Sequence, residues 1–173
     1  MVALHVKEAA VLTLAKLYLN QPIHHKAVIP MSAKNVETVR TAHDSWNRRD
    51  FQGVVNNAAE RLVYTDNARA LTLDNRDKFR EWTEAWAKAF SDGRITNPQY
   101  IGAGDRVITQ FTVTGTNDGP FGSMPATGRK ISLPFCEITH FDKKGRMVSG
   151  TCYYDQYTLL TQLGHVLPLV AAA

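Results

Sequence analysis

Residues 135–164 read FCEITHFDKKGRMVSGTCYYDQYTLLTQLG, and this stretch decides the fold. Two runs in it, residues 136–141 and 147–154, are rich in β-branched and aromatic residues, which favour pleated, half-buried strands. Between the runs, residues 142–145 (DKKG) begin with a turn-forming aspartate and end with a glycine that can adopt positive φ. The pattern predicts a β-hairpin, and we expect any pocket to be built on one of its faces.

The turn of this hairpin decides which side chains share a face, because successive side chains of a strand point to opposite sides. In a two-residue loop, Glu137 lies opposite Gly150, on the face that carries Cys152. In a three-residue loop with a glycine bulge, Cys136 lies opposite Cys152 instead, and the face changes. We favour the first register, which places Glu137 and Cys152 on the same face.

Helical patterns precede most strand patterns, which indicates an α+β fold rather than alternating α/β. The clearest helix is residues 75–91, where aromatic residues recur at steps of three and four. Residues 36–47 carry a similar stripe, on which His43 lies, and Asp50 is a predicted N-cap for a short helix that continues to Arg61. Strands are predicted at residues 62–66, 95–101, 106–115 and 129–135, with a long loop at residues 116–128.

The composition limits the class of protein and its partners. With 173 residues, 44% of them hydrophobic and 21% charged, the chain is long enough for one globular domain with a sizeable core. The net charge of +4 comes from scattered basic residues, so we expect no nucleic-acid partner. No apolar run is long enough for a membrane span, no secretory signal is evident, and two cysteines make no disulfide framework. We therefore expect a cytoplasmic protein.

Residues 1–30 are predicted to be an appended segment, and the main domain is assigned to residues 31–173. Residues 2–17 carry apolar residues near helical spacing, which indicates an amphipathic helix packed on the domain or on a partner chain. Residues 22–30 are then a linker. Alternatively, Met31 is itself a start, and the first thirty residues are an upstream extension.

Three segments resemble one known family. Residues 145–164 (GRMVSGTCYYDQYTLLTQLG) resemble the C-terminal signature of the SnoaL-like polyketide cyclases, within the superfamily of nuclear transport factor 2 and ketosteroid isomerase. Residues 43–51 (HDSWNRRDF) resemble the end of that family's first helix, and residues 115–135 (GTNDGPFGSMPATGRKISLPF) resemble its long strand–loop–strand. The resemblance runs from Val36 to Gly164. It implies a curved antiparallel sheet wrapped around N-terminal helices as a cone, a deep apolar pocket, and a homodimer formed through the sheet's outer face.

Glu137 is the first candidate for chemistry. It lies among Phe135, Ile138 and Phe141, so burial should raise the pKa of its carboxyl group if the side chain points inward. A carboxyl group with a raised pKa suits proton transfer beside a carbonyl. By resemblance, Glu137 occupies the position where the isomerase relatives carry a pocket acid. The alternative is a glutamate on the solvent side of a half-buried strand.

Two further positions decide whether such chemistry survives. The resemblance implies that cyclases tend to carry Asp or Asn at the position of Cys152, where the Asp removes the substrate proton. A thiol is mostly neutral at neutral pH, so either Glu137 supplies the base or the site has lost this chemistry and Cys152 is a small core residue. Asp155 matches the acid that the signature keeps before its LLxQLG exit. It is either a pocket base or a cap for the turn after the strand.

The remaining candidates come from strand alternation and helical stripes. Tyr64 and Asp66 share one face of the predicted first strand, whereas His140 is out of phase with Glu137, so one of those two should lie outside. The three tryptophans are predicted core residues that also line the cavity. No motif or local ligand spacing indicates a metal site. The catalytic candidates are Glu137, Asp155 and His140, and the substrate-binding candidates are Tyr64, Asp66, Trp46, Trp82, Trp86, Phe135, Cys152 and Tyr154.

These residues lead to two main functional hypotheses. The first is an enzyme that needs no cofactor and acts on a small apolar carbonyl compound, similar to an aldol-type polyketide or ester cyclase. A carboxylate, Glu137 or Asp155, would remove an acidic α-proton, and Tyr64, Tyr154 or His140 would hydrogen-bond the enolate. The second is a non-catalytic module for ligand binding or dimerisation, which the missing acid favours. Isomerase or epoxide hydrolase activity is a third option, although no Asp/Arg/Asp arrangement is recognisable.

Overall fold

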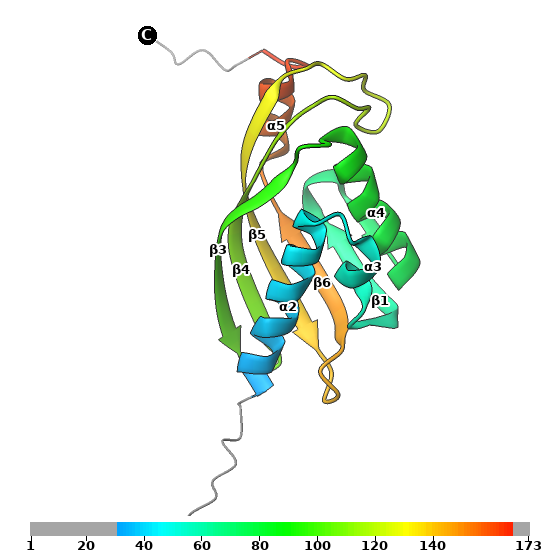
Figure 1. The fold of residues 1–173 in the computed structure, drawn as a ribbon, viewed down its shortest axis with the longest axis vertical. Helices are drawn as coiled ribbons and strands as arrows, with labels where there is room; N and C mark the ends of the chain where they lie inside the picture. Colours follow the sequence, from blue (N-terminus) through cyan, green and yellow to red (C-terminus); the bar gives the residue numbers. More distant parts are fainter. Residues whose placement is uncertain (1–30, 168–173) are drawn as a thin grey trace, which may run out of the picture.

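The computed structural model describes residues 31–167, so the appended helix and linker predicted for residues 1–30 lie outside the described residues. Figure 1 shows a curved sheet with the N-terminal helices on one side and a short helix after the last strand. The elements in chain order are α2 (Met31–Asn47), α3 (Phe51–Val55), β1 (Ala58–Asp66), η1 (Asn67–Arg69), β2 (Leu71–Leu73), α4 (Arg76–Ala89), β3 (Arg94–Ala103), β4 (Arg106–Thr116), β5 (Lys130–Phe141), β6 (Met147–Tyr153) and α5 (Gln156–Leu163).

The six strands form one sheet in the order β2-β1-β6-β5-β4-β3. Neighbouring strands are antiparallel, except that β1 runs parallel to β6. Two parallel strands need a long connection between them. Here the connection comprises all the elements from η1 to β5. Helices α2 and α4 pack against the sheet, and the structure therefore confirms the predicted α+β class with a curved sheet around N-terminal helices.

Strand β5 supplies the longest row of inward-facing side chains. From Ile131 to Phe141 every second residue is buried, as expected for a strand with one face against helices. The sequence predicted two separate strands here, meeting at Phe135, and this division is wrong. Pro134 does not interrupt the strand, because β6 pairs with β5 only from Cys136 onward and makes no ladder hydrogen bond at the proline.

The register of the final hairpin differs from both predicted alternatives. Glu137 lies opposite Cys152, not opposite Gly150. The turn is longer than predicted, because the Asp142 carboxylate accepts hydrogen bonds from two backbone N–H groups of the loop and a register shift follows His140. The pairing is thus displaced by two residues. A displacement of two keeps each side chain on its face, so Glu137 and Cys152 share a face as predicted.

Among the helices, the predicted cap at Asp50 is confirmed, whereas α2 begins at Met31 and so earlier than the predicted residue 36. Asp50 caps α3 through its side chain, and Asn75 caps α4 in the same way. The predicted continuation of the short helix to Arg61 is wrong, because β1 begins at Ala58. Ala58 pairs with Met147 of β6, and this tertiary pairing overrides the helical propensity of the local sequence.

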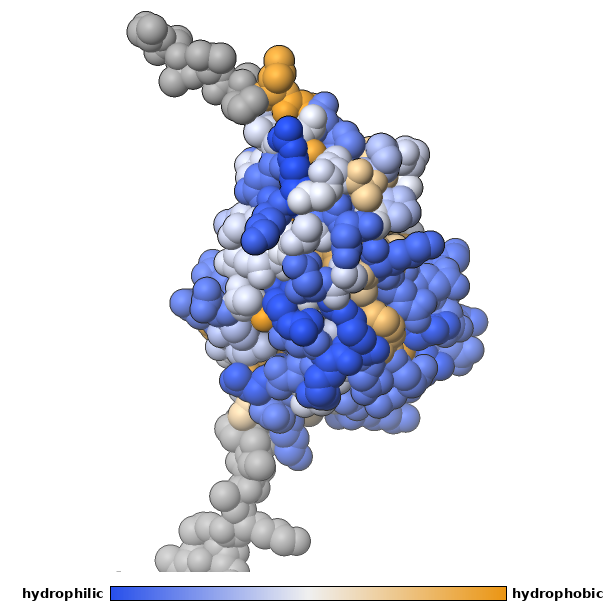
Figure 2. All heavy atoms as spheres, turned by 45° about the horizontal axis from the view of Figure 1, so that its top comes forward, coloured by the Kyte–Doolittle hydropathy of each residue, from blue (hydrophilic) through white to orange (hydrophobic). Residues whose placement is uncertain are grey.

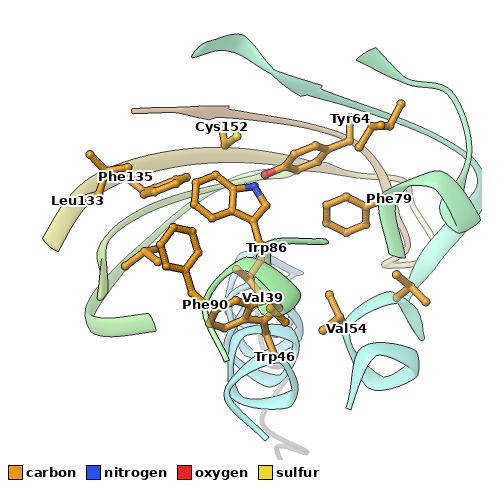
Figure 3. Packing of buried hydrophobic residues seen from close by; sticks show 14 of the residues in the cluster. Val39, Trp46, Val54, Tyr64, Phe79, Trp86, Phe90, Leu133, Phe135 and Cys152 are labelled. Atoms are coloured by element: carbon orange, nitrogen blue, oxygen red, sulfur yellow. The ribbon is translucent and has the colours of Figure 1, made fainter. Parts of the chain in front are cut away.

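The core lies between α4 and the inner face of the sheet. Figure 3 shows Phe79, Trp86 and Phe90 of this region packed toward Tyr64 and Phe135 of the sheet. The face drawn in Figure 2 is mostly hydrophilic, with apolar residues in small patches only. Within residues 31–167, no helix has the length and apolar character needed to cross a membrane. The cytoplasmic location stays a prediction.

Candidate active site

Glu137 is a buried acid on the inner face of β5, with 7% of its surface exposed. The hydroxyl of Tyr64 donates a hydrogen bond to its Oε1 at 2.7 Å, and Nε2 of His43 lies 3.2 Å from its Oε2. Both carboxylate oxygens are therefore held by side chains from other elements, β1 and α2. Of the two orientations that the sequence left open for Glu137, the structure has the inward one.

Tyr64 reaches Glu137 because β6 carries a glycine beneath its ring. Tyr64 pairs with Gly150, and a Cβ atom added to Gly150 would lie 2.7 Å from the ring of Tyr64. The phenol therefore lies across the backbone of β6 toward β5. Burial, together with the neighbouring Cys152 and Glu137, holds the pKa of Tyr64 well above its ordinary value, so the hydroxyl remains a donor.

His43 is a site residue that the sequence analysis placed only on a helical stripe. Its Nδ1 lies 3.2 Å from the hydroxyl of Tyr100 on β3, which is half-buried. One tautomer satisfies both contacts: Tyr100 donates to Nδ1 and Nε2–H donates to Glu137. Burial raises the pKa of Tyr100 to about 12, so this hydroxyl also keeps its proton. The result is a continuous chain of hydrogen bonds from Tyr100 to Tyr64.

Two small cavities meet at Glu137. The larger has a volume of about 70 Å³ and the smaller about 50 Å³, and both include Glu137 and His43 in their walls. Five predicted pocket residues, Tyr64, Trp46, Trp82, Trp86 and Phe135, line the larger one with Glu137, and its other lining residues are Ala42, His43, Val54, Phe79, Thr83, Ile95, Phe111 and Val113. A mostly apolar wall with a few placed polar groups is the usual form of a small-molecule site.

Asp66 and Tyr154, which were predicted to bind substrate, line neither of these two cavities. Asp66 is fully buried, and its Oδ2 accepts hydrogen bonds from Arg69 Nε at 2.7 Å, Trp82 Nε1 at 3.1 Å and the Tyr154 hydroxyl at 3.1 Å. The backbone N–H of Arg69 donates to Oδ1. This carboxylate is saturated with donors and holds Trp82 in the cavity wall.

Cys152 is a core residue beside the site rather than a part of its wall. It is 1% exposed and lies between Glu137 and Asp66 in the strand register. Burial is the main cause that raises the pKa of this thiol, and the charge of Asp66 adds to it. The thiol therefore stays neutral at physiological pH, which leaves Glu137 as the acid nearest to the cavity.

Alkaline pH is expected to destabilise the fold through the buried phenols and the thiol. Folding raises the pKa values of Tyr64, Tyr154 and Cys152, so the unfolded chain loses these protons first. The stabilisation is fully present below the unfolded pKa values of about 8.5 to 10, and it is lost above them at up to about 1.4 kcal/mol per pH unit for each group. Urea unfolding at several alkaline pH values, followed with tyrosinate absorbance, measures this slope. Tyr154→Phe should flatten it, and six tyrosines that all ionise freely in the folded state would contradict it.

Asp155 and His140, the other two catalytic candidates, lie outside the two cavities that Glu137 lines, so the structure does not bring them together with Glu137. Asp155 is exposed and caps α5, where its Oδ1 accepts a hydrogen bond from the backbone N–H of Tyr157 at 2.9 Å. The hydrogen bond from the Thr158 hydroxyl is the main cause that lowers the pKa of Asp155. His140 lies opposite Ser149 in β6, on the outer face, because three steps along the strand from Glu137 reverse the side.

The comparisons with known proteins agree with this architecture. A protein with a ketosteroid isomerase-like fold from Catenulispora acidiphila superposes with a TM-score of 0.64 at 18% identity, over 76% of this chain and 98% of its own. AclR from Streptomyces galilaeus, a proposed hydroxylase, gives 0.70 at 24% identity, over 80% of this chain and 86% of AclR. A proposed SnoaL-like polyketide cyclase from Jannaschia sp. CCS1 gives 0.73 at 17% identity, over 82% and 99%. These likenesses place the fold in the nuclear transport factor 2-like class.

The family follows from a match to the sequence itself. The family model described as SnoaL-like polyketide cyclase matches residues 36–163, which is most of the chain. The chain therefore belongs to the SnoaL-like polyketide cyclase family. No curated protein matches it. Within residues 31–167, no group of three or more His, Cys, Asp or Glu side chains is arranged to hold a metal ion.

Proposed function

We propose that this protein is a cyclase- or isomerase-like enzyme that needs no cofactor and removes an acidic proton next to a carbonyl of a small apolar substrate. The observation that carries the proposal is the position of Glu137, a carboxylate in the wall of an otherwise apolar cavity. Its two oxygens are held by Tyr64 and His43, which fix the orientation of the acid. A base that is positioned in this way needs little reorganisation when the substrate arrives.

The reaction can be written with its protons and electrons balanced. Glu137, as a carboxylate, takes the proton from the carbon beside the substrate carbonyl, and the electron pair of that C–H bond moves into the enolate. The enolate carbon then forms a bond to a second carbonyl carbon of the same substrate. The resulting alkoxide takes the proton back from Glu137, which restores the carboxylate. General base catalysis of this kind contributes about 10² to 10⁴ in rate.

The hydrogen bonds and positions of the three enolate donors that the sequence suggested favour a different donor. The hydroxyl of Tyr64 donates to Glu137, and the hydroxyl of Tyr154 donates to Asp66. His140 lies on the outer face. None of the three is therefore free to donate a hydrogen bond to a substrate oxygen in the cavity.

A non-catalytic ligand-binding module is the second candidate. The observation that favours it is that hydrogen bonds already occupy both oxygens of Glu137, while Cys152 is neutral where the family resemblance implies an acid. One experiment distinguishes the two functions. It compares the rate of hydrogen–deuterium exchange of a carbonyl probe in the presence of the native protein and of Glu137→Gln. Binding of the probe with no catalysed exchange supports the module.

We also infer a homodimer that forms through the outer face of the sheet. This face carries three exposed apolar side chains, Val63 (45%), Ile101 (58%) and Tyr153 (42%). Ile101→Lys is expected to convert the dimer to a monomer in sedimentation velocity, because a charge would be buried in the interface. Leu71→Lys is the matched control, since Leu71 is exposed but pairs with the inward-facing Asp66. A native protein that sediments as a monomer at high concentration would contradict the dimer.

A further inference from the structure

The proposed proton removal, on which this inference rests, moves negative charge onto the carbonyl oxygen of the substrate. A site of this kind needs a hydrogen-bond donor that is aimed at that oxygen and is not already used. Among the polar residues of the larger cavity, the hydroxyls of Tyr64 and Thr83 donate to Glu137 and to the Arg80 carbonyl, respectively. The remaining donors to consider are His43, which is engaged with Glu137, and the indole N–H groups.

Three tryptophans line the cavity, and they differ in one respect. Nε1–H of Trp46 donates to the Thr83 carbonyl at 3.2 Å, and Nε1–H of Trp82 donates to Asp66 at 3.1 Å. Trp86 is 4% exposed and its Nε1 has no hydrogen-bond partner. Figure 3 shows this nitrogen directed toward the hydroxyl end of Tyr64, where the phenol meets Glu137.

Other buried groups without a partner do not compete for this role. Within residues 31–167, four side chains besides Trp86 have a buried polar atom with no hydrogen bond, and none of them lines either cavity: Asn35, Thr109, Gln156 and Thr161. A buried N–H without an acceptor is unfavourable, and one that lines a cavity is satisfied when a bound molecule supplies the acceptor. Trp86 is thus the unpaired donor that faces the cavity.

We propose that Nε1–H of Trp86 donates a hydrogen bond to the carbonyl oxygen of the ligand and stabilises the developing enolate. The cavity then selects a compact apolar molecule with an acceptor oxygen at Trp86 and an acidic C–H at Glu137. The indole is held rigidly for this purpose by edge contacts with Phe121 at 4.8 Å and Tyr154 at 5.6 Å between ring centroids. A donor fixed by packing loses little freedom when it binds.

Binding of two probes of equal shape tests this directly. Cyclohexanone carries an acceptor oxygen, and methylenecyclohexane replaces that oxygen with a CH₂ group. In ¹H–¹⁵N spectra of the full chain, cyclohexanone should move the indole signal of Trp86 downfield and leave those of Trp46 and Trp82 nearly unchanged. Methylenecyclohexane should not move the Trp86 signal downfield. A Trp86 signal that is the same with both probes, while Val54 and Val113 methyl signals show that both occupy the cavity, would overturn the proposal.

Substitution gives a second measurement with internal controls. The ratio of the cyclohexanone affinity to the methylenecyclohexane affinity should fall by about three- to tenfold in Trp86→Phe. The same ratio should not change in Trp46→Phe, because the N–H of Trp46 is already used within the protein. Replacing Trp86 by benzothienylalanine, which has sulfur in place of N–H, gives the same test if the phenylalanine variant does not fold. A ratio that is unchanged in both Trp86 variants contradicts the proposal.

These outcomes are independent of whether Glu137 removes a proton. A downfield shift of the Trp86 signal with no catalysed exchange would support Trp86 as a ligand-binding residue and contradict the proposed enzyme activity. Catalysed exchange that depends on Glu137, without a shift of the Trp86 signal, would support the proposed enzyme activity and contradict the role of Trp86.

Discussion

Glu137→Gln is expected to lower the catalysed rate of hydrogen–deuterium exchange in a carbonyl probe by about 10² to 10⁴. The amide has nearly the shape of the carboxylate and can still accept the hydrogen bond from Tyr64, but it cannot take up the α-proton. A suitable probe is methyl 2-methylacetoacetate, a β-keto ester with one acidic C–H. Loss of its proton signal in deuterium oxide, corrected for the uncatalysed reaction, gives the rate.

Asp155→Asn is the matched control for this experiment. It makes the same chemical change at an acid that caps α5 and lines neither of the two cavities at Glu137, and Asn is as good a cap as Asp. The exchange rate of this variant should equal that of the native protein. If Glu137→Gln exchanges the probe as fast as the control, Glu137 is not the base and the proposed enzyme is wrong.

The second large effect concerns stability. Asp66→Ala is expected to lower the free energy of unfolding by about 3 to 5 kcal/mol, because it leaves Arg69, Trp82 and Tyr154 without their common acceptor in the interior. A loss of this size is a large part of the total stability of a typical domain. Urea unfolding followed by tryptophan fluorescence measures it.

An exposed ion pair supplies the comparison for this variant. Asp74 lies 2.8 Å from Lys78, and both side chains are more than half exposed. Asp74→Ala should change the free energy of unfolding little, since solvent screens such pairs. Equal effects of the two substitutions would show that the Asp66 cluster does not stabilise the fold.

The sequence predicted the fold better than it predicted the site, and particular residues show why. Alternation placed Glu137 and Cys152 on one face even though the turn was misjudged, because a register shift of two residues leaves each side chain on its face. The same alternation places His140 on the outer face once Glu137 lies on the inner face, because the two residues are three positions apart. The alternation of side chains along a strand can be predicted for each strand by itself.

The partners of these acids could not be predicted in the same way. His43 and Glu137 are 94 residues apart, and the stripe on α2 predicts only that His43 faces inward. Asp66 was correctly placed inside by alternation, but the tertiary positions of Trp82 and Tyr154 decide that it is enclosed rather than available to a ligand. Such contacts depend on how helices dock on the sheet, which no local pattern records.

The parallel contact between β1 and β6 has a consequence for how the molecule is made. During synthesis, Tyr64 emerges early, but Gly150, beneath its ring, is added near the end of the chain. Until the ribosome has released β6, one edge of β1 has no partner, and β1 is not joined to the rest of the sheet. Pairings this distant in sequence form slowly, so the contact between β1 and β6 should form late in folding.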